Sequence, residues 1–98
     1  MTAAVFAADE GLSVLMIEKT AQYGGTSAIS GGGIWIPNNH HFQAKGGNDS
    51  FDRAWTYLKA AVGDRVDDAR LRTYLEQAPR MVRELEECSR VRFAVAEK

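Results

Sequence analysis

The sequence predicts an α/β fold in which an incomplete nucleotide-binding unit precedes a helical segment. Residues 12–17 form a nearly continuous apolar run that ends at Glu18, which is the pattern of a strand covered on both faces of a parallel sheet. Residues 24–33 follow with five glycines and three hydroxyl residues. The later half of the chain carries apolar residues at helical spacing.

The chain begins in a predicted helix. Residues 2–10 are rich in alanine, and Gly11 stands where a left-handed residue would end a helix. A complete dinucleotide-binding unit reads strand, Gly-x-Gly-x-x-Gly, helix, strand, acid. Met1 already lies within the helical pattern, so we expect the first strand and its glycine turn to be missing from this chain.

Two further segments have weaker strand character. Residues 34–36 are apolar, but Pro37 follows them and allows only an edge strand or a turn. Large apolar side chains occupy every second position of residues 91–95, which predicts a second strand.

The segment between them is predicted to be helical. Apolar side chains recur three and four positions apart within residues 51–62, which predicts an amphipathic helix. A second pattern of this kind runs over residues 71–85, where an internal proline predicts a kink or two short helices. The predicted caps and breakers are Asp49, Ser50, Gly63 and Pro79.

Composition limits the possible functions. Ninety-eight residues suffice for one small domain, and a formal net charge of -1 gives no electrostatic reason to expect nucleic acid as a partner. Cys88 is the single cysteine, so no internal disulfide can form and a reducing compartment is expected. No apolar run reaches the ~18 residues of a membrane span, and no secretory leader is recognisable. We therefore expect no transmembrane segment and a cytoplasmic location.

Glu18 and the glycine-rich stretch are the candidate ligand-binding residues. A carboxylate at the end of a parallel strand can accept hydrogen bonds from ribose hydroxyls. Bare glycine backbone with nearby hydroxyls can approach phosphate without hindrance from side chains. The competing interpretations are a solvated glutamate beside Lys19 and a flexible linker over residues 24–33. The apolar residues interleaved with the glycines argue against a linker.

His40 and His41 lie in a polar, glycine-containing segment, residues 38–48, that is predicted to be a loop. Adjacent residues do not share a face on a helix or a strand, so joint metal ligation is not expected from them. A pair of surface loop residues is the favoured interpretation, and a position near a flavin is the alternative.

Together these motifs resemble a known family. The string Glu18-Lys19, a short spacer, Gly24-Gly25-Thr26-Ser27-Ala28, Ser30-Gly31-Gly32-Gly33 and Trp35-Ile36-Pro37-Asn38-Asn39 resembles the FAD-binding domain of the fumarate reductase/succinate dehydrogenase flavoprotein superfamily. The 3-ketosteroid Δ1-dehydrogenase branch is the most similar. The resemblance covers nearly the whole chain and implies a partial Rossmann-like FAD/NAD(P)-binding fold.

The resemblance implies that FAD is the cofactor. It places Glu18 on the adenosine ribose, and the segment 25–27 beside the pyrophosphate. Ser30 and the two following glycines would lie towards the flavin ring. It implies no catalytic residue and no metal ligand in this chain. The full set of implied cofactor-binding residues is Glu18, Lys19, Gly24, Gly25, Thr26, Ser27, Ser30, Gly31 and Gly32.

The predicted organisation is a remnant of an FAD-binding βαβ unit over residues 1–37, followed over residues 38–98 by a loop and a helical segment of the same domain. No second complete domain is expected. The implied function is that of a fragment of an FAD-dependent dehydrogenase acting on CH–CH groups of a small hydrophobic substrate, such as a 3-oxosteroid. A cofactor-free interaction protein and a fragment of an NAD-binding enzyme remain as alternatives.

Overall fold

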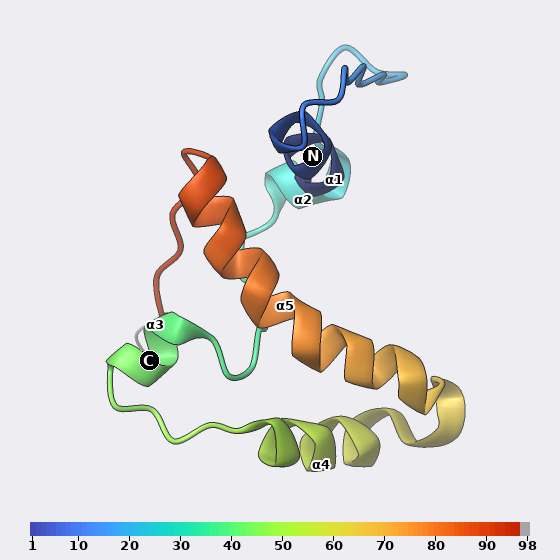
Figure 1. Ribbon diagram of the computed structural model, residues 1–98. Helices are drawn as coiled ribbons and strands as arrows, with labels where there is room; N and C mark the ends of the chain where they lie inside the picture. The colour runs from blue at the N-terminus through green and yellow to red at the C-terminus, as the bar shows by residue number, and fades with distance from the viewer. Residues whose placement is uncertain (97–98) are drawn as a thin grey trace. The chain divides into compact units, whose positions relative to one another are not determined.

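The computed structural model describes residues 1–96, which contain helices joined by irregular segments (Figure 1). The chain divides into two compact units, Met1–Trp35 and Ile36–Lys98. The described elements are α1 (Thr2–Asp9), α2 (Gly25–Ile29), α3 (His40–Ala44), α4 (Phe51–Val62), the 3-10 turn η1 (Gly63–Arg65) and α5 (Asp68–Cys88). None of these helices is both long enough and apolar enough to cross a membrane.

The predicted first helix is confirmed, and so is its stop. Gly11 has a φ of 78°, in the left-handed region that glycine tolerates best. Its N–H donates to the carbonyl of Ala8 at 3.0 Å, and the N–H of Leu12 donates to the carbonyl of Ala7 at 2.9 Å. These two bonds form a Schellman motif, which satisfies carbonyls that the helix end would otherwise leave open.

The predicted strands are absent from residues 1–96, so the α/β fold class is wrong for the described chain, which is all-helical. Residues 12–17 have no regular structure, and apart from the bond from Leu12 to Ala7 at the end of α1 they form no backbone hydrogen bond to another described segment. The side chains of Leu15 and Ile17 are 87% and 89% exposed. A parallel strand exists only through hydrogen bonds to a neighbour, and the described part of the chain offers none. Residues 34–36 and 91–95 are likewise irregular.

The glycine-rich stretch contains a short helix that its composition did not predict. Gly24 caps α2 with a φ of 105°, and Gly25 begins the helix with a φ of 54°. The next four residues, 26–29, contain no glycine, so the conformational cost of glycine in a helix interior does not apply to them. Three glycines then follow the end of α2.

The predicted amphipathic helix is confirmed as α4. Ser50 caps it, because its hydroxyl oxygen accepts a hydrogen bond from the N–H of Arg53 at 3.3 Å. Gly63 ends it with a φ of 57°. The second helix, α5, runs unbroken through Pro79, so the predicted pair of short helices is wrong. Proline removes one N–H, and buried side chains on both sides of it hold the helix against the core.

The buried core lies in the unit Ile36–Lys98, where α4 contacts α5, and most of its side chains belong to α5 (Figure 1). Trp55 of α4 also lies under the guanidinium of Arg72, whose central carbon is 4.4 Å from the ring centroid. The Lys59 ammonium donates to Asp68 at 2.8 Å and to Asp64 at 3.4 Å, and these carboxylates raise its pKa. The buried apolar side chains are Ala54, Leu71, Leu75, Ala78, Val82 and Leu85.

The segment predicted as a loop over residues 38–48 contains the short helix α3. Asn39 caps it, because its side-chain oxygen accepts a hydrogen bond from the N–H of Phe42 at 3.0 Å. The Phe42 ring packs over Gly47 so closely that a Cβ there would lie 2.3 Å from it. The cap and this contact fix the turn that carries His40 and His41.

Replacement of Leu75 tests the position of the core. Leu75 is 4% exposed, so we expect Leu75→Ala to lower the free energy of unfolding by about 2–5 kcal/mol. Leu15→Ala removes the same atoms at an exposed position and should change it by less than about 0.5 kcal/mol. Urea unfolding followed by circular dichroism measures both, and equal losses would contradict the assigned core.

Candidate functional site

Glu18 lies at an exposed turn with its carboxylate open to solvent. Its Oε1 accepts a hydrogen bond from the N–H of Thr20 at 3.1 Å. The Thr20 hydroxyl in turn donates to the carbonyl of Gln22 at 2.6 Å. These bonds hold the turn that follows the apolar run, and they leave the second carboxylate oxygen available to a ligand.

Gly24 and Gly25 begin α2 in backbone conformations that residues with side chains rarely adopt. A Cβ on Gly24 would lie 2.7 Å from the Cβ of Ala28, and the φ of 105° is itself unfavourable for other residues. Gly25 has nothing within 4 Å of an added Cβ. The backbone at this point is thus bare on its open side, as a closely approaching ligand requires.

Ser30 closes a second turn behind α2. Its hydroxyl donates to the carbonyl of Ser27 at 2.9 Å and accepts from the N–H of Gly32 at 3.1 Å. Gly32 has a φ of 72°. The hydroxyl of Ser30 is therefore occupied within the turn, and its main effect is to fix the backbone of residues 30–32.

The structure brings some of the predicted cofactor-binding residues together and leaves others apart. Ser27, Ser30 and Gly32 share one hydrogen-bonded turn. Within the described residues, no hydrogen bond joins Glu18 or Lys19 to that turn. All nine predicted residues belong to the unit Met1–Trp35, which contains no buried residue. They form an open surface in this unit.

A second polar cluster, which sequence reasoning missed, surrounds Glu86 on α5. His40 Nε2 lies 3.0 Å from Glu86 Oε2, and His41 Nε2 lies 2.9 Å from both carboxylate oxygens. The two histidines therefore share one side-chain partner, although adjacent residues do not share a face of a regular helix or strand. The two imidazole rings lie next to each other, with centroids 4.1 Å apart and their planes inclined by 35°. Both Nε2 atoms contact the same Glu86 carboxylate. No local spacing signals this contact, since 45 residues separate His41 from Glu86.

The Glu86 carboxylate is largely covered, with 13% of its side chain exposed. Its Oε1 also accepts a hydrogen bond from the backbone N–H of Phe93 at 2.9 Å. That N–H is the main cause of a lowered Glu86 pKa, partial burial opposes it, and His41 and His40 add to the lowering. The ionised carboxylate thus joins α3, α5 and the segment after α5.

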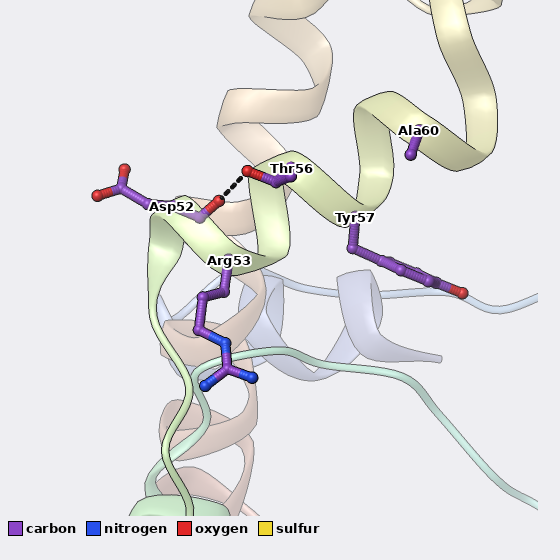
Figure 2. Close-up of a pocket in the computed structure, with 5 residues that line it drawn as sticks. All are labelled: Asp52, Arg53, Thr56, Tyr57 and Ala60. Atoms are coloured by element: carbon purple, nitrogen blue, oxygen red, sulfur yellow. Dashed lines mark hydrogen bonds between the residues drawn. The ribbon is translucent and has the colours of Figure 1, made fainter.

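The outer face of α4 is hollowed, but its side chains do not converge (Figure 2). The Thr56 hydroxyl donates to the carbonyl of Asp52 at 2.8 Å, which is a bond within the helix. Arg53 donates to the carbonyl of Asn48 at 2.8 Å. Figure 2 shows the Asp52 carboxylate, the Arg53 guanidinium and the Tyr57 ring pointing in different directions. This face therefore lacks the convergent polar groups of a binding site.

Comparison with known proteins gives the family. The model of the FAD binding domain matches residues 1–98. This chain belongs to the FAD binding domain family. A 3-oxosteroid 1-dehydrogenase of Mycolicibacterium smegmatis is 46% identical over 82 residues, which cover 84% of this chain and 14% of the relative. A 4-oxocyclohexanecarboxylate 2-dehydrogenase of Sinomonas cyclohexanicum is 42% identical over 86 residues, covering 88% of this chain and 15% of the relative.

A solved structure agrees with these matches. The 3-ketosteroid delta1-dehydrogenase from Sterolibacterium denitrificans, in complex with 1,4-androstadiene-3,17-dione, aligns with a TM-score of 0.81 and 55% sequence identity. The alignment covers 88% of this chain and 15% of that chain. The chain thus spans about a seventh of the length of the relatives that it matches. The sequence-based resemblance to the flavoprotein family and to its 3-ketosteroid dehydrogenases is confirmed.

Because the pKa of Glu86 is lowered, the free energy of unfolding is expected to fall as the pH is lowered into the acid range. Because folding favours the ionised carboxylate, its contribution is present above the ordinary pKa of 4.5 and is lost as the pH falls through the lower folded pKa. We therefore expect Glu86→Gln to destabilise the chain at about pH 7 and to differ less from the parent below about pH 4. Glu87→Gln, at an exposed neighbour on α5, is the control. Equal destabilisation by Glu86→Gln at both pH values, measured by urea unfolding, would contradict this assignment.

Proposed function

We propose that this chain is the portion of an FAD-dependent dehydrogenase that contacts the adenosine and pyrophosphate of the cofactor. The observation that carries the proposal is the set of exposed glycines Gly25, Gly31 and Gly32, whose backbone has open space around it, following the exposed Glu18. Membership of the FAD binding domain family supports FAD rather than a nicotinamide cofactor.

The residues present fit such a cofactor. Carboxylate oxygens of the kind that Glu18 exposes accept hydrogen bonds from ribose hydroxyls. The backbone of Gly25 and the side chains of Thr26 and Ser27 are exposed donors for a pyrophosphate. Lys19 is exposed beside Glu18 and adds a positive charge near a doubly anionic ligand. The open space around Gly31 permits a flat ring to approach the backbone.

The proposed role of this chain is to bind and orient the cofactor. Bound FAD supplies the hydride-accepting chemistry of a dehydrogenase. The glycine positions keep side chains away from the ligand, and Ser30 fixes the backbone turn that presents Gly32. None of the described residues is assigned a catalytic role.

The proposed substrate class is a small hydrophobic cyclic ketone that loses hydrogen from a CH–CH group. The names of the relatives support it, since one acts on 3-oxosteroids and another on 4-oxocyclohexanecarboxylate, and both compounds are rings that carry an oxo group. A 3-oxosteroid is the finer proposal. Its support is the 55% identity to a structure solved with a steroid dione.

A titration of the chain with FAD, followed by quenching of flavin fluorescence, tests the proposal. We expect saturable binding, weakened about 10- to 100-fold by Glu18→Ala, because a hydrogen bond to a charged group contributes about 1.5–3 kcal/mol. Glu10→Ala removes the same charge at an exposed position outside the proposed site and should leave affinity unchanged.

A pair of glycine variants tests the backbone geometry of the proposed site without changing its charge. Gly24→Ala introduces a Cβ 2.7 Å from Ala28 at a left-handed φ and should weaken binding. Gly33→Ala meets nothing within 4 Å and has no left-handed φ, so it should bind like the parent. If the parent chain binds no FAD and its helix content does not change when FAD is added, a cofactor-free interaction protein is favoured. Preference for NAD over FAD would favour the nicotinamide alternative.

A further inference from the structure

We propose that His40, His41 and Glu86 bind a divalent transition-metal ion of the zinc class. All three residues belong to the unit Ile36–Lys98. Each offers one ligand atom, and these atoms lie within 4.8 Å of one another. The proposal does not depend on FAD binding, because none of the three belongs to the proposed cofactor site.

The distances are close to those that a metal ion requires. Zinc binds histidine nitrogen and carboxylate oxygen at about 2.0–2.2 Å, so tetrahedral ligand atoms lie about 3.3 Å apart. The Nε2 atoms of His40 and His41 lie 3.0 Å and 2.9 Å from the Glu86 carboxylate oxygens. The ligand atoms of all three residues lie within 4.8 Å of one another, so the side-chain tips must rotate until the two nitrogens and a carboxylate oxygen face one ion.

The donor set suits a borderline transition metal. Two imidazoles and one carboxylate are typical ligands of zinc, and imidazole also favours cobalt, nickel and copper over magnesium or calcium. Three protein ligands leave a fourth position for water. All three side chains are partly exposed, with 28% for His40, 32% for His41 and 13% for Glu86, so an ion can enter from solvent.

The surroundings hold the three ligands in place. Asn39 caps α3 and so fixes the turn that carries the histidines. The N–H of Phe93 donates to Glu86 Oε1 at 2.9 Å, which orients the carboxylate as outer-shell partners orient metal ligands. His40 Nδ1 is buried without a hydrogen-bond partner among the described residues. The hydrogen bond that orients the His40 ring is therefore the one between its Nε2 and Glu86.

Titration of the tag-free full chain with Co²⁺, read from visible d–d absorption, tests the proposal. The chain contains two histidines and one cysteine, so few other ligands compete. We expect one equivalent of Co²⁺ to bind and Zn²⁺ to displace it. His40→Ala, His41→Ala and Glu86→Gln should each weaken binding at least about tenfold. Glu87→Gln, one position along α5 and exposed, should bind like the parent.

Two further measurements keep the outcome decisive. Cys88→Ser should leave the absorption unchanged, because the proposed ligands include no thiolate. In the parent chain, Zn²⁺ should shift the imidazole NMR signals of both histidines, which needs no variant to fold. Unshifted imidazole signals, the absence of saturable Co²⁺ binding, or binding that survives Glu86→Gln at full strength would overturn the proposal and leave an ordinary ion pair.

Discussion

The packing of α4 against α5 is the interaction on which the unit Ile36–Lys98 depends. The buried apolar side chains come from these two helices, with Ala54 on α4 and the other five along α5. Because α5 is held along its length, Glu86 near its end has a fixed position. Its carboxylate then forms hydrogen bonds with His40, His41 and the backbone N–H of Phe93. The polar cluster is thus a consequence of the apolar packing.

The unit Met1–Trp35 depends on a different constraint, which is the need of an apolar extended segment for a neighbour. Residues 12–17 have the composition of a doubly covered strand, yet their side chains are exposed and their backbone forms no strand pairing with a described segment. The local structure of this unit is stabilised by short-range hydrogen bonds. They form the Schellman motif at Gly11 and the turns at Glu18 and Ser30. These local turns are also where the proposed FAD contacts lie.

The sequence predicted where the longer helices end, which short-range contacts control, but it missed the short helices α2 and α3 and the features that long-range contacts control. The ends of α1 and α4 were predictable, because Gly11, Ser50 and Gly63 act within a few positions of themselves. The strands were not, since strand pairing is a property of two segments. Of the two outcomes predicted at Pro79, two short helices was wrong, because packing on both sides outweighs one lost N–H. The Glu86 cluster carried no local signal, whereas the family was evident from motifs around Glu18 and Gly24.

The central claim is that residues 18–32 contact FAD. Mapping the amide chemical shifts of the ¹⁵N-labelled chain during an FAD titration tests this claim most directly. We expect saturable shifts at residues 18–19 and 24–32, with the amides of α4 and α5 unchanged. Shifts confined to the unit Ile36–Lys98, or none at all at saturating FAD, would contradict the account.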